Sequence, residues 1–258
     1  MSDNRVNYNQ IAPNYHQRYA VNPLAGVAGE LRTLAQKGGV GDVLEVGCGT
    51  GRWLAELQSF AGRIYGVDLS PGMLSQARER DAGFRLTRAD ANHLPFPDAA
   101  FDLVFCVNAL HHFGSPRAFV AEARRLLRPG GALAVVNMDP HTGRDRWYLY
   151  DYFAETREID LRRFPSGGAL LDWMIGAGFS RAEWRVAEHI YKEQVGREVL
   201  DDHFLQKHGT SQLALLSDEA YAAGLSRIHA ALAEAEASGT EAVFTTDLWL
   251  PLMVGWIG

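Results

Sequence analysis

A glycine-rich segment that follows the first apolar run of the sequence has the composition of a ligand-binding loop. It reads Glu45-Val46-Gly47-Cys48-Gly49-Thr50-Gly51 and leads into a predicted helix. Glycines at such a turn permit positive φ and let a ligand approach the backbone, while the helix presents unpaired N–H groups. The G-x-G-x-G spacing disagrees with both common phosphate loops. A dinucleotide fingerprint needs glycine where Arg52 stands, and a P-loop needs lysine directly after Gly51.

Three acidic residues accompany the predicted strands around this loop. Glu45 lies inside the first strand, Asp68 ends the second strand 17 residues after Gly51, and Asp90 follows the third. A carboxylate in the position of Asp68 can accept two hydrogen bonds from a ribose diol, and Asp90 can accept from an exocyclic amine. Together the three acids suit a nucleoside ligand without phosphates, preferably a cationic one. The alternative is that Asp68 and Asp90 only cap helices.

The adjacent pair His111-His112 follows the fourth predicted strand, at the edge where a substrate would bind. With an unperturbed pKa near 6.5, histidine is suited to act as a general base. We expect one of the two to be catalytic, with His112 preferred because it is nearer the following loop, and the other to be structural. Neighbouring histidines on a loop do not easily share one metal, so no metal site is predicted. Cys48 and Cys106 are expected to be small core residues.

The elements that would position these residues form an alternating series between Asp42 and Met138. Short apolar runs that barely alternate indicate strands buried on both faces, with helices between them, as in βαβ units on a parallel sheet. Ser70-Pro71 and Ser115-Pro116 each place an N-cap hydroxyl before a proline suited to the first helical turn. The predicted strands are Val43–Val46, Ile64–Val67, Phe84–Leu86, Leu103–Val107 and Ala132–Val136.

The segments outside this series complete a larger architecture. We expect one or two helices in Val6–Gln36 before it, and helices in Arg144–Leu161 and Gly168–Ile175 after it. Phe179–Ile190 is predicted to be a sixth strand and Ala242–Val254 a last one. Between them, residues 191–238 are predicted to form a helical cap, with a helix that begins at Ser217. The sequence therefore predicts an α/β fold: a doubly wound, mostly parallel seven-stranded sheet with a cap inserted before the last strand.

The composition restricts the class of protein and its partners. The 258 residues, 47% of them hydrophobic, suffice for one large domain with a cap. The net charge of −6 and the acidic cap disfavour nucleic acid binding. Met1–Gln10 is polar and no apolar run is long enough for a bilayer, so neither a secretory signal nor membrane insertion is expected. With two cysteines, a cytoplasmic location fits best; the oligomeric state is not indicated.

Five segments in register closely resemble the class I S-adenosylmethionine-dependent methyltransferases, of the small-molecule type related to the ubiquinone and menaquinone methyltransferases. The resemblance covers roughly residues 7 to 138 and implies a Rossmann-like methyltransferase fold. It implies lid helices in residues 1–40, a cofactor-binding core in 41–138, and a completed sheet with a substrate cap in 139–258. The segments are the glycine loop from Val43 to Gly51, Gly66–Leu74, Asp90–Phe96, Phe101–Val104 and Leu127–Gly131.

The resemblance also implies roles for individual residues toward S-adenosylmethionine. Gly47, Gly49 and Asn108 would lie beside its methionine part, with Glu45 reaching the amino group. The remaining residues would act as follows: Asp68 on the ribose hydroxyls, Leu69 and Met73 on the two faces of the adenine, Asp90 and Ala91 on its edge, and Tyr15 and Arg18 as a lid.

We therefore expect methyl transfer by in-line displacement to a small organic acceptor, with oxygen as the first choice of atom and nitrogen or carbon open. The regions expected to line the acceptor pocket, residues 139–165 and 191–238, contain many aromatic residues, which would suit an aromatic or apolar acceptor. Two other functions stay open at this point. One is an RNA or protein methyltransferase, and the other is a protein that binds the cofactor without transferring methyl.

Overall fold

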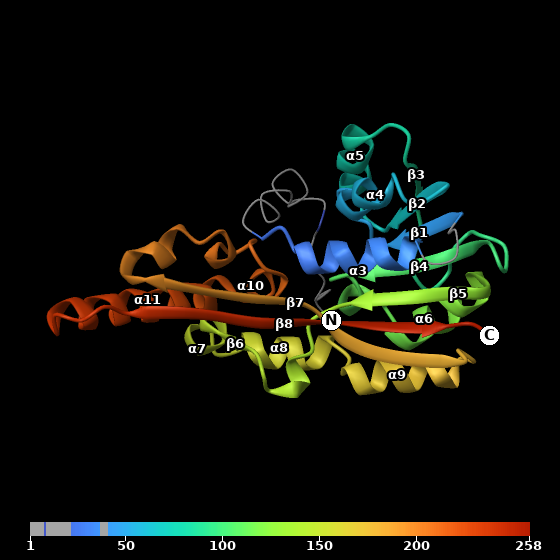
Figure 1. Cartoon of the computed structure of the whole chain (residues 1–258). Helices are drawn as coiled ribbons and strands as arrows, with labels where there is room; N and C mark the ends of the chain where they lie inside the picture. The colour runs from blue at the N-terminus through green and yellow to red at the C-terminus, as the bar shows by residue number, and fades with distance from the viewer. Residues whose placement is uncertain (1–7, 9–21, 37–40) are drawn as a thin grey trace.

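The computed structural model describes Tyr8, residues 22–36 and residues 41–258. In these ranges an eight-stranded sheet runs in the order β3-β2-β1-β4-β5-β8-β6, and β7 also pairs with β8 (Figure 1). The first five strands are parallel, and β8 is antiparallel to β5, β6 and β7. The strands are β1 (Asp42–Val46), β2 (Arg63–Asp68), β3 (Arg85–Arg88), β4 (Phe101–Val107), β5 (Leu127–Val136), β6 (Arg146–Trp147), β7 (Arg181–Val195) and β8 (Val243–Trp256).

The prediction of a doubly wound, mostly parallel sheet is confirmed. The sheet has eight strands instead of the expected seven, because Arg146 and Trp147 form a two-residue strand at the start of a segment that we expected to be helical. Two residues are too few to show the period-2 alternation by which a strand is found in a sequence.

Helices cover both faces of the parallel strands. Helices α3 (Ala25–Gln36) and α4 (Arg52–Leu57) pack on one face, and α6 (Pro116–Leu126) and α9 (Gly167–Gly176) pack on the other (Figure 1). Every residue of β1 is buried, as expected for a strand between two helical layers. The carboxyl ends of the parallel strands therefore meet along one edge that helices leave accessible, which is where ligands bind in open α/β sheets.

Serine side chains fix where several helices begin. Ser70 Oγ accepts a hydrogen bond from Met73 N at 3.2 Å at the start of α5 (Pro71–Arg80), and Ser115 does the same for α6. Ser217 caps α11 (Asp218–Ala237). All three N-caps confirm the sequence prediction, and each satisfies an amide that the helix cannot pair internally. The N-cap of α6 is Ser115, so neither histidine of the preceding pair has that role.

The antiparallel strands β7 and β8 are joined by residues 196–242 and form a long two-stranded ribbon, which we call the hairpin. It extends well past the parallel strands (Figure 1). Near the sheet, Leu252–Trp256 of β8 pair with β5, whereas farther out β8 pairs only with β7 and β6. The register of the hairpin shifts between Val186 and Glu188, opposite Pro251 and Leu250. We predicted a strand only as far as Ile190, but β7 continues to Val195 because it stays paired with β8.

We call the outer half of the hairpin with its helices the cap region. It has its own buried cluster, built on Tyr148, Phe153, Ile228 and Phe244. The expected helix over Arg144–Leu161 is divided in two. The helical elements here are α7 (Tyr148–Tyr152), α8 (Thr156–Arg163), α10 (Ser211–Ala214), α11, and the 3-10 turns η4 (Gly196–Asp201) and η5 (His203–Leu205).

Of the helices expected in Val6–Gln36, α3 is the one that lies largely in the described part of the chain. It packs against β7, where Gly26 N donates to Glu188 Oε2 at 2.7 Å. Across the described ranges, none of the helices has both the length and the apolar character needed to cross a bilayer.

Candidate functional site

The glycine loop leaves the carboxyl end of β1 and folds against β2. The amides of Gly47 and Cys48 both donate to Val67 O, at 2.7 and 3.0 Å. Gly47 and Gly49 have φ of 75° and 51°, in the left-handed region that favours glycine. A Cβ on Gly47 would lie 2.5 Å from the Cβ of Ala109. The loop therefore requires glycine at this point both for its backbone angle and for its contact with the segment after β4.

Asp68, at the end of β2, joins the loop to helix α5. Its Oδ2 accepts from Gly49 N and its Oδ1 from Ser70 N, both at 2.8 Å. Burial raises the pKa of Asp68, although the main-chain amides that donate to it act in the opposite direction. A carboxylate has about four acceptor positions, more than these amides occupy, and the residue lines a cavity. Asp68 thus holds the loop in shape and can also accept hydrogen bonds from a ligand.

Glu45 is a buried carboxyl beneath the same loop. It is 1% exposed, and its Oε2 has no hydrogen-bond partner among the described residues. Burial raises its pKa well above the usual range, and the nearby charge of Asp68 raises it further. A buried carboxyl in this condition is favourable for a cationic ligand, because a positive charge would offset the cost of its ionisation.

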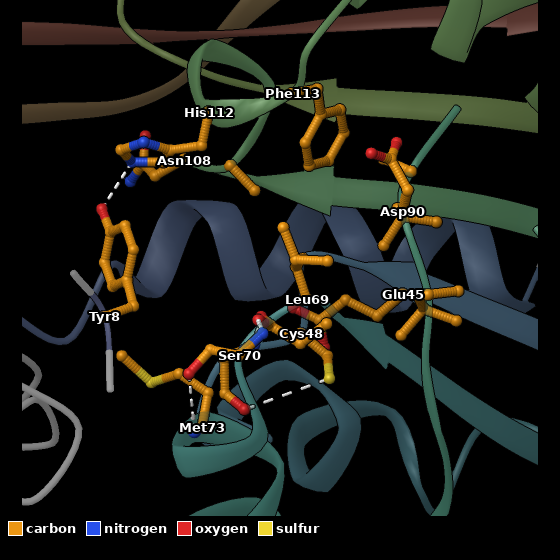
Figure 2. Close-up of a pocket in the computed structure, with 18 of the residues that line it drawn as sticks. Tyr8, Glu45, Cys48, Leu69, Ser70, Met73, Asp90, Asn108, His112 and Phe113 are labelled. Carbon is orange, nitrogen blue, oxygen red and sulfur yellow. Dashed lines mark hydrogen bonds between the residues drawn. The ribbon is translucent and has the colours of Figure 1, made fainter. Parts of the chain in front are cut away.

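A cavity of about 550 Å³ runs along this edge of the sheet (Figure 2). Asp90 lies at the opposite end from Tyr8 and His112. The side chain of Leu69 is 53% exposed, whereas Met73 and Ala91 are buried. Asp90 Oδ1 accepts from Asn92 N at 2.8 Å, so this carboxylate orders its own turn. All predicted site residues in the described part of the chain line this cavity.

The segment after β4 carries Asn108 and the two histidines. Asn108 has φ of 50°, and its amide donates to Val136 O at 2.8 Å. His111 and His112 lie in the 3-10 turn η2 (Leu110–His112), with ring centroids 3.9 Å apart. The turn places both rings at the end of the large cavity.

His111 is oriented by two groups from other elements. Its Nδ1 lies 3.1 Å from Asn137 Oδ1, and its ring stacks on Phe164 with centroids 4.0 Å apart. With the amide oxygen toward the ring, Nδ1 carries the proton and the lone pair is on Nε2. Asn137 is 1% exposed, so this contact is shielded from water.

His112 has charged and polar partners. Its Nδ1 lies 3.1 Å from Nη2 of Arg163, and its Nε2 lies 2.5 Å from the hydroxyl of Tyr8 (Figure 2). A guanidinium only donates, so Nδ1 must accept and the ring proton is on Nε2, which donates to Tyr8. The lone pair of His112 is therefore engaged by Arg163.

A second cavity, of about 140 Å³, adjoins the first. The two share Asn108, His111 and His112 in their walls. The other walls of the small cavity come mainly from the cap region and the outer hairpin, including Trp147, Phe204 and Ser211. The histidine pair thus lies where a cavity lined by the core meets one lined by the cap region.

Sequence reasoning missed three residues of this site, namely Tyr8, Asn137 and Arg163. Asn137 had a detectable signal, because it follows β5 directly at the edge where the other site residues lie. Arg163 had none, since it ends a strongly polar helix that contains other arginines. The predicted lid residues Tyr15 and Arg18 lie outside the described residues. Within the described ranges, His, Cys, Asp and Glu side chains form no group of three or more suited to a metal ion.

Comparison with known proteins shows what the core of the chain is similar to. Residues 44–135 match the family described as methyltransferase domain. A demethylmenaquinone methyltransferase of Tropheryma whipplei is 39% identical over 99 residues, which are 36% of this chain and 40% of the relative. A malonyl-[acyl-carrier protein] O-methyltransferase of Hahella chejuensis is 41% identical over 119 residues, 43% of this chain and 42% of the relative. The chain therefore spans about two fifths of the length of these curated relatives.

The similarity in fold to a solved structure extends beyond the core. Phosphoethanolamine N-methyltransferase 2 of Haemonchus contortus, solved with S-adenosyl-L-methionine, superposes with a TM-score of 0.61. It covers 96% of this chain and 57% of its own, at 18% identity, which supports a shared fold. The glycine loop, the acids and η2 all lie in or beside the matched segment of the sequence. Residues 44–135 therefore form a methyltransferase domain similar to the class I S-adenosylmethionine-dependent methyltransferases, with relatives that include quinone methyltransferases.

Proposed function

We propose that this protein transfers a methyl group from S-adenosylmethionine to a small organic molecule. The observation that carries the proposal is the pair of adjoining cavities that meet at Asn108, His111 and His112. The large cavity is lined by the family's core segment and the small one largely by residues outside it. This arrangement suits a cofactor and an acceptor that approach each other from opposite sides of η2.

The residues of the large cavity fit the cofactor. Glu45, buried and with an unpartnered oxygen, would receive its positively charged methionine end, beside the backbone of Gly47 and Gly49. Asp68 would accept from the ribose hydroxyls with its remaining lone pairs. The other roles are those that the resemblance implies: Leu69 and Met73 against the adenine faces, Asp90 and Ala91 at its edge, and Asn108 beside the methionine part.

The bound cofactor would supply a methyl group attached to a positively charged sulfur, and a nucleophile of the acceptor would displace this sulfur from the methyl carbon in line. The protein then has to hold the acceptor in line and exclude water, and such orientation can lower a barrier by about 7 to 11 kcal/mol. The walls of the small cavity suit this role. Trp147 and Phe164 are buried, and Leu248 and Leu250 of β8 add apolar surface.

A hydroxyl acceptor must also lose its proton, and His111 is better placed than His112 to take it. Asn137 accepts from Nδ1 of His111, which places the basic nitrogen of this ring at Nε2. The lone pair of His112 is engaged by Arg163, and protonation of that nitrogen would break this contact. We assign His111 as the base, which receives the proton as the new bond to the methyl carbon forms, and His112 as a positioning residue.

The acceptor is a small molecule in this proposal, with oxygen as the first choice of methylated atom and nitrogen or carbon next. Two relatives are named for demethylmenaquinone and for malonyl-[acyl-carrier protein]. Between residues 191 and 238 acidic residues outnumber basic ones eight to four, which disfavours an RNA acceptor. The aromatic walls of the small cavity favour an aromatic or apolar acceptor.

Calorimetry with S-adenosylmethionine and S-adenosylhomocysteine tests the cofactor assignment. Asp68→Ala should weaken binding of both by at least about tenfold, because it removes a charged acceptor and loosens the loop. Asp81→Ala is the matched control, since Asp81 also accepts from a main-chain amide, that of Gly83, but lies outside the cavity. A wild-type protein that binds neither compound would refute the proposal.

Transfer is tested by incubating a metabolite extract with S-adenosylmethionine labelled in its methyl group. Label in a small molecule supports the proposed function. Label in RNA or protein, or cofactor binding with no transfer in any fraction, would contradict it. His111→Gln should then slow transfer by about a hundredfold without weakening cofactor binding, whereas His112→Gln should act mainly through acceptor affinity.

A further inference from the structure

The guanidinium of Arg163 is a cation in the wall of the large cavity, next to the point where the two cavities meet. Its side chain is 17% exposed. Nη2 contacts His112 Nδ1 at 3.1 Å, and Nη1 donates to Ser211 Oγ at 3.2 Å. Both partners are neutral groups, so these hydrogen bonds fix the direction of the guanidinium without balancing its charge. Burial lowers the pKa of Arg163, as expected for a cation that has lost much of its hydration.

The nearest carboxylate compensates this charge incompletely. Asp160 Oδ1 lies 3.9 Å from Nη1 of Arg163, beyond hydrogen-bond distance, and has no hydrogen-bond partner among the described residues. Asp160 Oδ2 instead accepts from the hydroxyl of Tyr150 at 2.9 Å. Arg163 has five N–H donors, and its hydrogen bonds to His112 and Ser211 use two of them. Donors and charge are therefore available for an anionic ligand.

The neighbours of Arg163 connect it to the small cavity. Its hydrogen-bond partner Ser211 and the next residue along the chain, Phe164, both line that cavity. Phe164 also stacks on His111, the proposed base. A ligand that contacts Arg163 from this side would thus extend past the aromatic ring toward His111.

We propose that Arg163 binds a carboxylate of the methyl acceptor, so that the substrate is a small organic acid whose methylated atom lies toward His111. This inference rests on the proposed function, because it assigns an acceptor to the small cavity. A planar guanidinium can hold a carboxylate with two parallel hydrogen bonds, which fixes orientation as well as affinity. Arg163 acts as a specificity-determining residue that selects anionic over neutral acceptors.

Benzoate and benzamide are suitable probes, because they have the same size and differ in charge. Calorimetry is performed with the protein saturated with S-adenosylhomocysteine, so that the cofactor's own carboxylate already occupies its place. Benzoate should bind at least about tenfold more tightly than benzamide. Arg163→Met should abolish this preference. Arg162→Met should retain it, because Arg162 is a neighbour on α8 whose side chain is 69% exposed.

A second variant tests the same idea through a gain of binding. Asp160→Asn removes the negative charge beside Arg163 and should tighten benzoate binding by about threefold or more, while benzamide binding stays unchanged. This result does not depend on whether Arg163→Met folds.

Three results would overturn the inference: equal binding of benzoate and benzamide, an unchanged preference in Arg163→Met, or benzoate binding that S-adenosylhomocysteine abolishes. The last result would assign Arg163 to the cofactor's carboxylate. Failure to bind S-adenosylhomocysteine at all would instead refute the proposed function.

Discussion

Asp160→Asn should stabilise the protein at neutral and alkaline pH. Asp160 is 1% exposed, and burial raises its pKa from 3.8 to about 6, against the opposing effects of Tyr150 and Arg163. The difference between these values corresponds to about 3 kcal/mol. In the unfolded chain Asp160 ionises near pH 4, and in the folded protein near pH 6. Ionisation therefore favours the unfolded state as pH rises between these values, and the loss of stability is complete above about pH 6.

The asparagine variant has no such titration but keeps an oxygen that can accept from Tyr150. Its free energy of unfolding should exceed that of the wild type by up to about 3 kcal/mol at pH 8, and the two should converge at pH 4. Urea unfolding followed by circular dichroism at pH 4, 6 and 8 measures this difference. Asp172→Asn, an exposed residue of α9, is the control and should change little. A wild type that is more stable than the variant at pH 8 would show that the contact with Arg163 outweighs the cost of burial, and would refute the reasoning.

Two further predictions concern packing and a second carboxylate. Gly224→Ala should destabilise the protein by about 2 kcal/mol or more, because its Cβ would lie 2.1 Å from the ring of Phe153. Gly29→Ala, in α3 with open space at its Cβ, should stabilise the protein by up to about 1 kcal/mol. Equal effects of the two substitutions in thermal unfolding would contradict the assigned packing. Asp42→Asn should lower stability at pH 7, because hydrogen bonds from two arginines hold the pKa of Asp42 below its usual range. This loss should disappear as pH falls below that lowered pKa, and a variant as stable as the wild type in urea at pH 7 would show that the two arginine contacts contribute nothing.

The parallel core could be predicted because the residues that determine each of its elements are close together in the sequence. Apolar runs, N-cap serines and the glycine loop each depend on a few neighbouring residues, and parallel strands bring their carboxyl ends to one edge. Glu45, Asp68 and Asp90 therefore meet in one cavity although 45 positions separate the first from the last. The same rule brought the histidine pair to this edge.

The cap region and its contribution to the site depend on contacts that no local pattern encodes. Arg163 reaches His112 across 51 positions, and Asn137 reaches His111 across 26. The outer part of β7 is exposed at most positions, so its sequence lacks the apolar alternation that would have extended the strand prediction to Val195. Pairing with β8, which the sequence does not show, keeps it extended.

The shift in register of the hairpin marks a position at which the cap region can be exchanged between related proteins. Ala187 is the extra residue there, next to Val186, whose partner Pro251 has a ring nitrogen that cannot donate a ladder hydrogen bond. On one side of this shift β8 belongs to the sheet of the core, and on the other side to the cap region. A chimera joined in both strands at this point would keep the inward and outward alternation of each half, whereas a slip of one residue would turn Leu252 to the wrong face. New caps should therefore be grafted within the strands, not at the loops.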